Sequence, residues 1–298
     1  MRTTEELREL ARIARIDAMK ELWAAQSGHP GSSLSSMDVL ITLYFGSYLR
    51  YRADEPHWAD RDVFVLSNGH AAPGYYSCLA LAGYLNRHEL ATLRKLGSRL
   101  EGHVKRGSVP GVEASAGSLG QGLNFSTGVA VAIRRKQSDR RVYVMMSDGE
   151  QQEGSTWEGI MFAASQRLAN LIAIVDQNGN QINGPTHTIQ PIMDDLPKKY
   201  AAFGWHTQEI DGHDFTQIRE GLDAALANEE GPSVLISHTV TGKGVPYMEG
   251  DYHWHHGVVT DDLFLRAMEA LGEKVSTHPD ETWQPGVTRL PAGVGLTE

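Results

Sequence analysis

Hydrophobic and polar positions recur at helical spacing over the first part of the chain. Between residues 4 and 25, apolar side chains return every three or four positions, which predicts an amphipathic helix. Thr3 and Glu6 have the spacing of a capping box at the start of this helix. Residues 26–36 are rich in Gly, Ser and Pro and interrupt the pattern, and a second helix is expected over 37–49.

Further along the chain, short apolar runs alternate with helical patterns. The runs are bounded by Gly, Asp or Asn and resemble buried strands, at 63–66, 142–146, 171–175, 207–210 and 234–237. Helical patterns are found at 75–81, 89–96, 122–135, 157–168, 215–226 and 261–271. This order predicts an α/β fold, a doubly wound parallel sheet with helices on both faces. We assign residues 1–275 to this domain and expect 276–298, rich in Pro, Gly and Thr, to form an extended C-terminal tail.

Composition and charge narrow the classes of function. The 298 residues are 41% hydrophobic and 21% charged, which is typical of a globular protein. The net charge of −10 disfavours nucleic acid or an anionic membrane as a partner. Cys78 is the only cysteine, so no disulfide within the chain and no cysteine-based metal site can form. The polar start and the lack of a long apolar run lead us to expect a cytoplasmic protein.

Polar side chains follow two of the predicted strands, within one βαβ unit. Asp148 and Gly149 come directly after the strand at 142–146, and Asn178 and Asn180 come after the strand at 171–175. Ligands of an open α/β sheet bind beyond the carboxyl ends of its strands. The Asp148 carboxylate, the Asn178 amide oxygen and the backbone carbonyl of Asn180 are oxygen ligands suited to Mg²⁺ carrying a diphosphate. Gly149 would let the backbone approach that diphosphate, at the start of a helix.

A simpler interpretation of these two segments exists. Asp-Gly and Asn-Gly are common turn pairs, and either pair alone is more often a turn than a binding site. The joint spacing of the two segments favours the ion site.

Histidines beside glycines form a second signal. His29, His70 and His103 each lie in a turn flanked by Gly, where they could line one polar pocket and relay protons near neutral pH. A single histidine is more often a surface or satisfied core residue, and we assign four others to that class: His187, His206, His213 and His238. No HxxxH or HExxH spacing is present, so we do not expect a zinc site.

Two further segments carry weaker signals. Residues 117–122 read Gly-Ser-Leu-Gly-Gln-Gly before a predicted helix, which allows close approach of a ligand to the backbone. The segment is neither a Rossmann fingerprint nor a P-loop. Residues 252–257 contain His253, His255 and His256, which indicates either a catalytic segment or a solvated loop anchored by aromatic residues.

Together these segments resemble the thiamine-diphosphate-binding domain of transketolases. The resemblance covers about residues 10–260, and the motifs occur in family order: Ser-Gly-His-Pro-Gly, Leu-Ser-Asn-Gly-His, Gly-Ser-Leu-Gly-Gln-Gly, and Asp-Gly-Glu with its later Asn. It implies the thiamine-diphosphate-binding fold. It also implies an enzyme, a transferase that moves a two-carbon ketol unit from a ketose to an aldose.

The resemblance implies roles for individual residues. The metal ligands would be Asp148, Asn178 and the Asn180 carbonyl, around Mg²⁺ or another divalent cation such as Ca²⁺ or Mn²⁺. Cofactor contacts would come from His70, Gly117, Leu119, Asp148, Gly149, Glu150, Glu153 and Asn178. Glu153 would also link two cofactor sites across a dimer. The catalytic histidines would be His29, His70, His103, His255 and His256, and the resemblance leaves open which of the last two faces the active site.

The chain is shorter than full transketolases, which continue into a pyrimidine-binding domain and a third domain. We therefore expect a separate C-terminal transketolase subunit to supply the pyrimidine-binding domain, in an α2β2 heterotetramer. The groups that bind the far end of the sugar lie mostly outside this domain in full-length relatives. A sugar phosphate, a sulfosugar and a branched-sugar phosphate are all compatible small anionic substrates.

Three alternatives have less support. The α-subunit of a thiamine-dependent 2-oxo acid dehydrogenase or decarboxylase is also split, but relatives of that kind lack this set of Gly-His segments. Deoxyxylulose-phosphate synthase is disfavoured for the same reason and because it is a single chain. A non-catalytic paralogue would have no need for Asp148, Asn178 and the histidines together.

Overall fold

A parallel sheet forms the centre of the computed structural model, which describes residues 2–193 and 195–277. Its strands lie in the order β1-β2-β3-β7-β6, and every neighbouring pair is parallel. Their bounds are β1 Val63–Leu66, β2 Val142–Ser147, β3 Leu171–Gln177, β6 His206–Asp211 and β7 Ser233–His238. Strands β1, β2, β3 and β7 are mostly apolar and almost fully buried. Strand β6 lies at an edge of the sheet and is largely exposed. The predicted fold class is confirmed.

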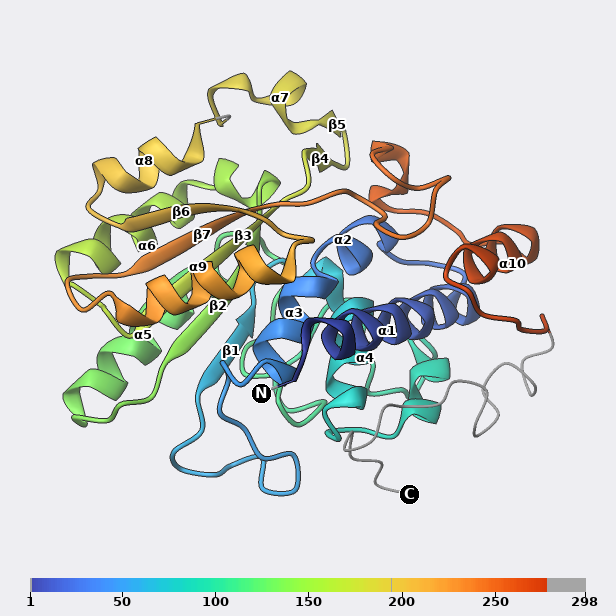
Figure 1. The fold of residues 1–298 in the computed structure, drawn as a ribbon, viewed down its shortest axis with the longest axis horizontal. Coiled ribbons are helices and arrows are strands. Elements are labelled where there is room, and N and C mark those ends of the chain that lie inside the picture. Colours follow the sequence, from blue (N-terminus) through green and yellow to red (C-terminus); the bar gives the residue numbers. More distant parts are fainter. Residues whose placement is uncertain (1, 194, 278–298) are drawn as a thin grey trace.

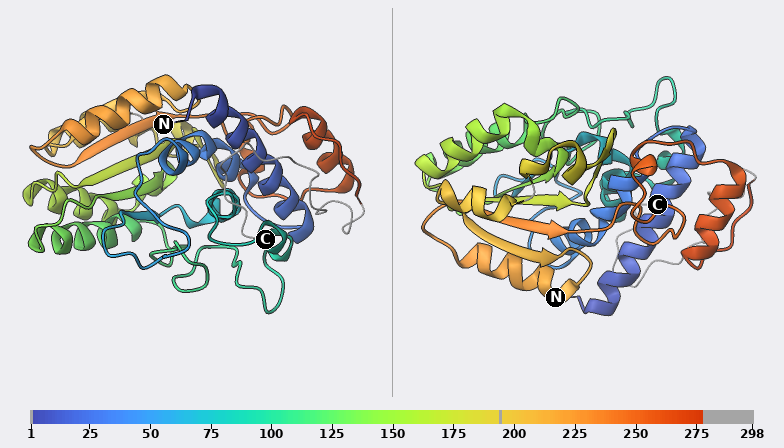
Figure 2. Two further views of the ribbon diagram at one scale, coloured as in Figure 1. Left: turned by 60° about the horizontal axis from the view of Figure 1, so that its bottom comes forward. Right: turned by 90° about the horizontal axis from the view of Figure 1, so that it is seen from above.

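Helices cover both faces of the sheet (Figures 1 and 2). On one face, Val144 and Met146 of β2 belong to the same apolar cluster as residues of three helices, α5 Gly122–Arg135, α6 Gly154–Ser165 and α8 Leu196–Ala202. Tyr143 and Met145 point the other way, because successive side chains of a strand alternate between faces. Their cluster includes α1 Thr4–Ala25, α3 Met37–Phe45, α4 Ala72–Leu81, α9 Phe215–Ala227 and α10 Asp261–Ala270.

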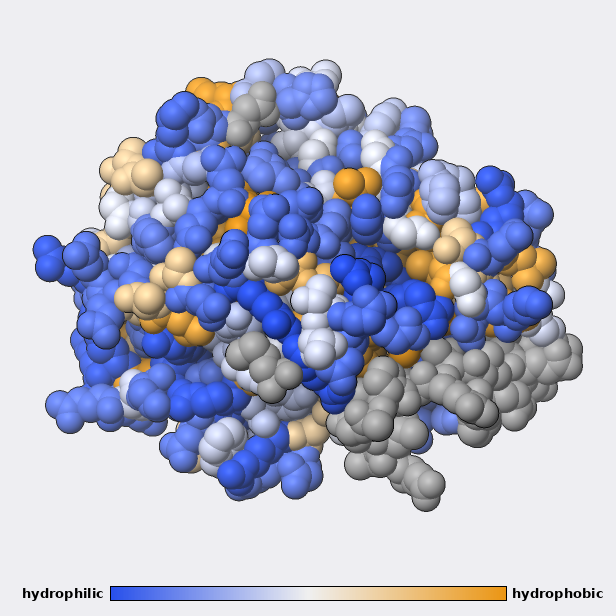
Figure 3. All heavy atoms as spheres, viewed as in Figure 1, coloured by the Kyte–Doolittle hydropathy of each residue, from blue (hydrophilic) through white to orange (hydrophobic). Residues whose placement is uncertain are grey.

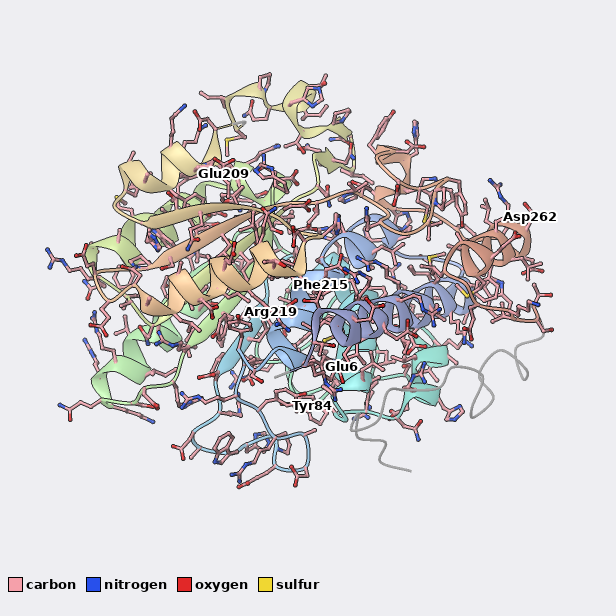
Figure 4. The ribbon with its side chains drawn as sticks, viewed as in Figure 1. Glu6, Tyr84, Glu209, Phe215, Arg219 and Asp262 are labelled. Atoms are coloured by element: carbon pink, nitrogen blue, oxygen red, sulfur yellow. The ribbon has the colours of Figure 1, made fainter. Side chains whose placement is uncertain are left out.

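The first helix begins where the sequence predicts. The Thr3 hydroxyl accepts from the Glu6 N–H, and the Glu6 carboxylate accepts from the Thr3 N–H, so the capping box is formed. Helix α9 lies beside α1 through Phe215 and Arg219 (Figure 4). The Arg8 guanidinium lies 6.0 Å from the centre of the Phe215 ring, and Arg219 donates to the carbonyl of Arg2. These contacts fasten the start of α1 to the helix that follows the edge strand.

Two predicted helices need correction. The helix expected at 89–96 is wrong, because the structure has a 3-10 helix, η2 Arg87–Thr92, after which Arg94 adopts a positive φ of 58°. The Arg94 backbone N–H donates to the carbonyl of Leu100, which turns the chain back and leaves Leu96 fully exposed. The helix expected at 37–49 ends at Phe45, because Gly46 and Ser47, with a φ of 72° at Ser47, do not continue it.

Several short elements were not predicted. Within the Gly/Ser/Pro stretch lies α2 Pro30–Ser35, which starts on a proline and is buried throughout. The segment after β3 forms β4 Asn180–Gln181, β5 Gly184–Pro185, α7 Thr186–Ile189 and η4 Pro191–Met193. The remaining 3-10 helices of the described residues are η1 Gly69–Ala71, η3 Gly149–Gln152 and η5 Tyr252–His255. Most of the predicted tail, residues 278–298, lies outside the described residues.

The surface in Figure 3 is mostly hydrophilic, with apolar residues in scattered spots. None of the helices in the described part of the chain has the length and apolar character needed to cross a membrane.

The carboxyl end of the sheet is the region where the candidate chemistry lies. Beyond the tip of β3, the β4–β5 hairpin, α2 and η5 gather side by side (Figure 1). Every sequence motif with candidate chemistry lies in or beside this region.

Candidate active site

Asp148 stands directly after β2 and is only 3% exposed. One of its carboxylate oxygens accepts from the Gly149 N–H at 2.8 Å. The other accepts from the Gly179 N–H at 2.8 Å and from the Thr186 hydroxyl at 3.1 Å. Ser147 pairs with Asp176 in the sheet register, so the ends of β2 and β3 lie side by side. Gly179 and Thr186, which follow β3, therefore lie close enough to donate to Asp148. The structure therefore brings together the two strand-end segments that the sequence singles out.

A second buried carboxylate, Asp176, lies next to Asp148. Asp176 accepts from the hydroxyls of Ser35 and Thr239. Burial, together with the nearby negative charge of Asp176, raises the pKa of Asp148 to about 7. Within the described residues, neither carboxylate forms an ion pair with a lysine or arginine. Two buried acids without a cationic side chain are an arrangement that a bound divalent cation can neutralise.

Asn178 and Asn180 complete this strand-end group. The Asn178 amide oxygen accepts from the Asn180 N–H at 3.0 Å and keeps a second lone pair for a ligand. The Asn180 amide nitrogen is occupied, because it donates to the Thr241 hydroxyl at 2.8 Å and to the Gly250 carbonyl at 3.3 Å. The metal ligand that the sequence predicts from Asn180 is its backbone carbonyl.

The donor set fits a hard cation. Across residues 2–193 and 195–277, no three or more His, Cys, Asp or Glu side chains are grouped to hold a metal ion. The oxygens of Asp148, Asn178 and the Asn180 carbonyl can do so in combination with a phosphate ligand, as Mg²⁺ prefers.

Glu150 connects three segments beneath this group. It is fully buried. Its carboxylate accepts from the Ser67 hydroxyl, from the Gly120 N–H at 2.7 Å and from the Ser147 N–H at 3.3 Å. Burial raises the pKa of Glu150 although these hydrogen bonds lower it. Both of its oxygens are engaged within the protein, so Glu150 fixes the glycine-rich loop against the ends of β1 and β2.

Three further residues expected to contact a cofactor, Gly117, Leu119 and Glu153, are exposed or half-buried in this chain. Gly117 is exposed with a φ of 149°, and a side chain there would come within 3.7 Å of the His103 ring. Leu119 is half-buried. Glu153 stands at the start of α6, is exposed, and makes no side-chain hydrogen bond or ion pair with any described residue.

The structure collects the predicted active-site histidines into one cluster. The centre of the His29 ring lies 5.3 Å from that of His70, 5.6 Å from His103, 5.7 Å from His255 and 4.8 Å from His256. Burial, together with the neighbouring imidazoles, lowers the pKa of His29 to about 2, of His70 to about 3 and of His255 to about 4. These rings are therefore neutral at pH 7, and each can both donate and accept a hydrogen bond.

His255 and His256 both face this cluster, at different depths. The His255 ring is half-buried and lies 5.0 Å from the His70 ring. His256 is exposed beside His29. The four histidines assigned to a structural class lie elsewhere: His187, His206 and His238 are exposed, and His213 contacts Asp38.

Sequence reasoning missed two residues that border the cluster. Arg94 donates to the Ser27 hydroxyl at 2.7 Å, and its guanidinium lies against Gly102, where a side chain would come within 2.3 Å of Arg94 Nε. Ser32 lies 3.1 Å from His70 Nε2. Arg94 joins the turn that carries His29 to the loop that carries His103. The helix wrongly expected at 89–96 concealed this contact, because an arginine in an amphipathic helix is normally taken for a surface residue.

The fold and the site together define a class of protein. A parallel sheet whose strand ends present buried oxygen ligands, beside a cluster of imidazoles that includes three neutral rings, is typical of an α/β enzyme that holds an anionic cofactor through a divalent cation. Comparison with known families identifies the class more closely. The chain belongs to the family described as "Transketolase, thiamine diphosphate binding domain", which it matches over residues 6–287.

Curated relatives of similar length are named as parts of transketolases. The chain is 38% identical over 254 residues to one of the named subunits of apulose-4-phosphate transketolase from Phocaeicola vulgatus, covering 85% of this chain and 89% of that protein. It is 36% identical over 266 residues to "6-deoxy-6-sulfo-D-fructose transketolase subunit SqwG" of Clostridium sp., covering 89% and 96%. The chain is thus a transketolase subunit of the N-terminal, thiamine-diphosphate-binding type, and hence part of a transferase, as the sequence predicts.

Solved transketolases have the same fold. The TM-score is 0.85 against transketolase from Leishmania mexicana, at 30% identity over 89% of this chain and 41% of that one. Against transketolase from Campylobacter jejuni it is 0.86, at 30% identity over 91% and 43%. This chain therefore spans less than half the length of those solved transketolases.

Proposed function

We propose that this chain holds the diphosphate of thiamine diphosphate through Mg²⁺ and, with a partner subunit, transfers a two-carbon ketol unit from a small anionic ketose to an aldose. The observation that carries the proposal is the buried Asp148 group at the strand ends beside the histidine cluster. The Asp148 group suits a cation that carries the charged diphosphate, and the histidine cluster suits the hydroxyls of a sugar. The reaction requires these two kinds of site next to each other.

The residues of this chain divide the work between them. Asp148, Asn178 and the Asn180 carbonyl would bind the cation, and Gly149, which has no side chain, would let the backbone approach the diphosphate. Thiamine diphosphate, when bound, supplies the carbanion chemistry and the electron sink. The rings of His29, His70, His103, His255 and His256 would donate to and accept from sugar hydroxyls, and pass protons to and from the reacting oxygens. Three of them, His29, His70 and His255, are neutral at pH 7.

A partner completes the site in this proposal. Gly117 and Glu153 are exposed next to the site, and the similar chains are named as subunits, which supports a separate C-terminal subunit with the pyrimidine-binding domain. The assembly is an α2β2 heterotetramer in which Glu153 lies between two cofactor sites. The names of the relatives refer to a sugar phosphate and a sulfosugar, which supports an anionic ketose as the substrate. The cytoplasmic location stays a prediction.

Replacement of Asp148 tests the metal assignment. Asp148→Asn should weaken Mg²⁺-dependent binding of thiamine diphosphate at least about 100-fold, because one ligand of the cation loses its charge. The cofactor-free chain should keep its fold, because the change also removes a charge that repels Asp176. Binding is measured by calorimetric titration with and without Mg²⁺, and folding by circular dichroism. Asp139→Asn, at an exposed acid, is the control and should bind normally. Unchanged affinity of Asp148→Asn would refute the assignment.

A further inference from the structure

His213 lies outside the histidine cluster, just after β6, and has a defined partner on each ring nitrogen. Its Nε2 lies 2.9 Å from the backbone nitrogen of Val240, and its Nδ1 lies 2.7 Å from a carboxylate oxygen of Asp38. A backbone N–H can only donate, so Nε2 must accept. The proton of the neutral ring is therefore on Nδ1 and is donated to Asp38. The two contacts select one tautomer and one ring orientation.

Asp38 is itself held in place. Both of its oxygens accept from the Arg15 guanidinium, at 2.8 and 2.7 Å, and both side chains are buried. Burial raises the pKa of Asp38, but Arg15 and His213 outweigh it and lower that pKa to about 2, so the carboxylate stays ionised. Such a two-pronged ion pair has a fixed geometry. The His213 ring is therefore anchored to α1 and α3, the helices that carry Arg15 and Asp38.

The other side of His213 faces the loop that supports the strand-end group. Val240 stands between Thr239, whose hydroxyl donates to Asp176, and Thr241. The Thr241 hydroxyl donates to the Asn178 carbonyl at 3.3 Å and accepts from the Asn180 amide at 2.8 Å. Each residue beside Val240 thus contacts the segment that carries two of the proposed metal ligands.

The chain makes room for this contact with a glycine. A side chain at Gly212 would lie 2.2 Å from the Ser237 hydroxyl and 2.5 Å from a methyl group of Thr239. Only a residue without Cβ allows the segment before His213 to approach β7 this closely. The Gly212 N–H donates to the His238 carbonyl at 2.8 Å, which places the His213 ring within reach of Val240.

We propose that His213 is a positioning residue for the diphosphate and cation site. It transmits the fixed position of the Arg15–Asp38 pair to residues 239–241, and through them to Asn178 and Asn180. This inference rests on the proposed function for the identity of the ligand. The tautomer of His213 does not depend on it.

Two substitutions separate positioning from simple packing. His213→Leu fills the space but removes both hydrogen bonds. His213→Gln keeps an amide donor for Asp38 and an oxygen acceptor for Val240. We expect His213→Leu to weaken Mg²⁺-dependent thiamine diphosphate binding by roughly 10- to 100-fold, as is typical when a group behind metal ligands is lost. His213→Gln should restore the affinity to within about threefold of the original chain.

The control is a histidine at the same end of the sheet. His238 is the last residue of β7 and pairs with Glu209 of the edge strand β6, and both side chains are exposed. His238→Leu should therefore leave binding unchanged. A second readout needs no cofactor: the ¹⁵N shifts of the His213 ring in the full chain should report a protonated Nδ1 and an unprotonated Nε2.

Each outcome decides the question. Original affinity in His213→Leu, a His213→Gln variant as weak as His213→Leu, or a proton on Nε2 would overturn the inference. If His213→Leu does not fold, His213→Gln and the ring shifts still decide. Loss of binding in Asp148→Asn with normal binding in His213→Leu would overturn this inference alone. Absence of any Mg²⁺-dependent binding by the original chain, also in the presence of its partner subunit, would overturn the proposed function and this inference with it.

Discussion

Three residues of the histidine cluster, His29, His70 and His255, are neutral at pH 7 because the fold removes them from water. His70 is 6% exposed, and burial, with His255 and His103 nearby, lowers its pKa to about 3. An unfolded histidine has a pKa of about 6.5. Between these values the unfolded chain binds more protons than the folded one, so the free energy of unfolding falls as the pH falls from about 6.5 towards 3. Above a pH of about 6.5, protonation of His70 no longer lowers the free energy of unfolding.

Replacement of His70 should therefore change the pH dependence of stability. In His70→Gln, the loss of unfolding free energy between a pH of about 7 and a pH of about 5 should be smaller than in the original chain by about 2 kcal/mol. Urea unfolding at the two pH values measures this difference. His187→Gln is the control, because His187 is exposed and outside the cluster. An identical pH dependence in His70→Gln and the original chain would show that His70 is not held neutral by burial.

The site residues that could be predicted are those whose chemistry is visible locally. Asp148, Asn178 and the Gly-flanked histidines each lie in a short motif at a strand end or turn. Asp176 and Arg94 could not be assigned in this way, because they act through partners distant in the sequence. Asp176 accepts from Ser35, 141 positions away, and Arg94 donates to Ser27, 67 positions away. Such pairs become visible only when the fold brings them together.

At the scale of elements, the packing of α2 against α4 sets the position of part of the site. Gly74 of α4 lies so close to α2 that a Cβ there would be 2.3 Å from the Ser33 carbonyl oxygen. Helix α2 also carries Ser32, the partner of His70. A larger residue at position 74 must push α2 away from α4.

Gly74→Ala should therefore destabilise the chain by about 1–3 kcal/mol, the usual cost of overpacking a buried contact. Gly128→Ala on α5 is the matched control, because nothing lies within 4 Å of its Cβ position and the residue is exposed. There the alanine should stabilise the chain by about 0.5–1 kcal/mol, since glycine is a poor helix former. Thermal and urea unfolding measure both changes. Equal effects at the two positions would contradict the close packing of α2 and α4.

The elements that could be predicted are those with a clear hydrophobic period or a buried apolar run. This was sufficient for the sheet strands and for α1, α5, α9 and α10. The segment between β3 and β6 was not predictable, because tertiary contacts hold its short elements. The Tyr200 hydroxyl donates to Gln151 at 2.8 Å, and the Trp205 indole donates to the Ile160 carbonyl at 2.9 Å. Helix α8 depends on these neighbours more than on its own residues.

At the scale of the whole molecule, one side of the site is left uncovered by the described part of this chain. Gly117, Ser118 and Glu153 are exposed, although each lies beside buried groups of the site. A carboxylate such as Glu153, exposed and without a hydrogen-bond or ion-pair partner among residues 2–193 and 195–277, usually changes the free energy of unfolding by less than about 0.5 kcal/mol. Its position is better explained by a role in an assembled enzyme than by a role in the stability of this chain.

Glu153→Gln should therefore change the assembled enzyme and not the isolated chain. On its own, the original chain should show no ketol transfer, and addition of a partner with a pyrimidine-binding domain should restore it. Glu153→Gln should have the same melting temperature as the original chain but lower the turnover of the mixture at least about tenfold, as expected for a group that moves or holds a proton. Glu158→Gln, at an exposed acid of the same helix, should leave both quantities unchanged. Full activity of the purified chain by itself would contradict the split-enzyme proposal. Normal turnover of the mixture with Glu153→Gln would contradict only the role of Glu153, because the other groups of the site are untouched by that substitution.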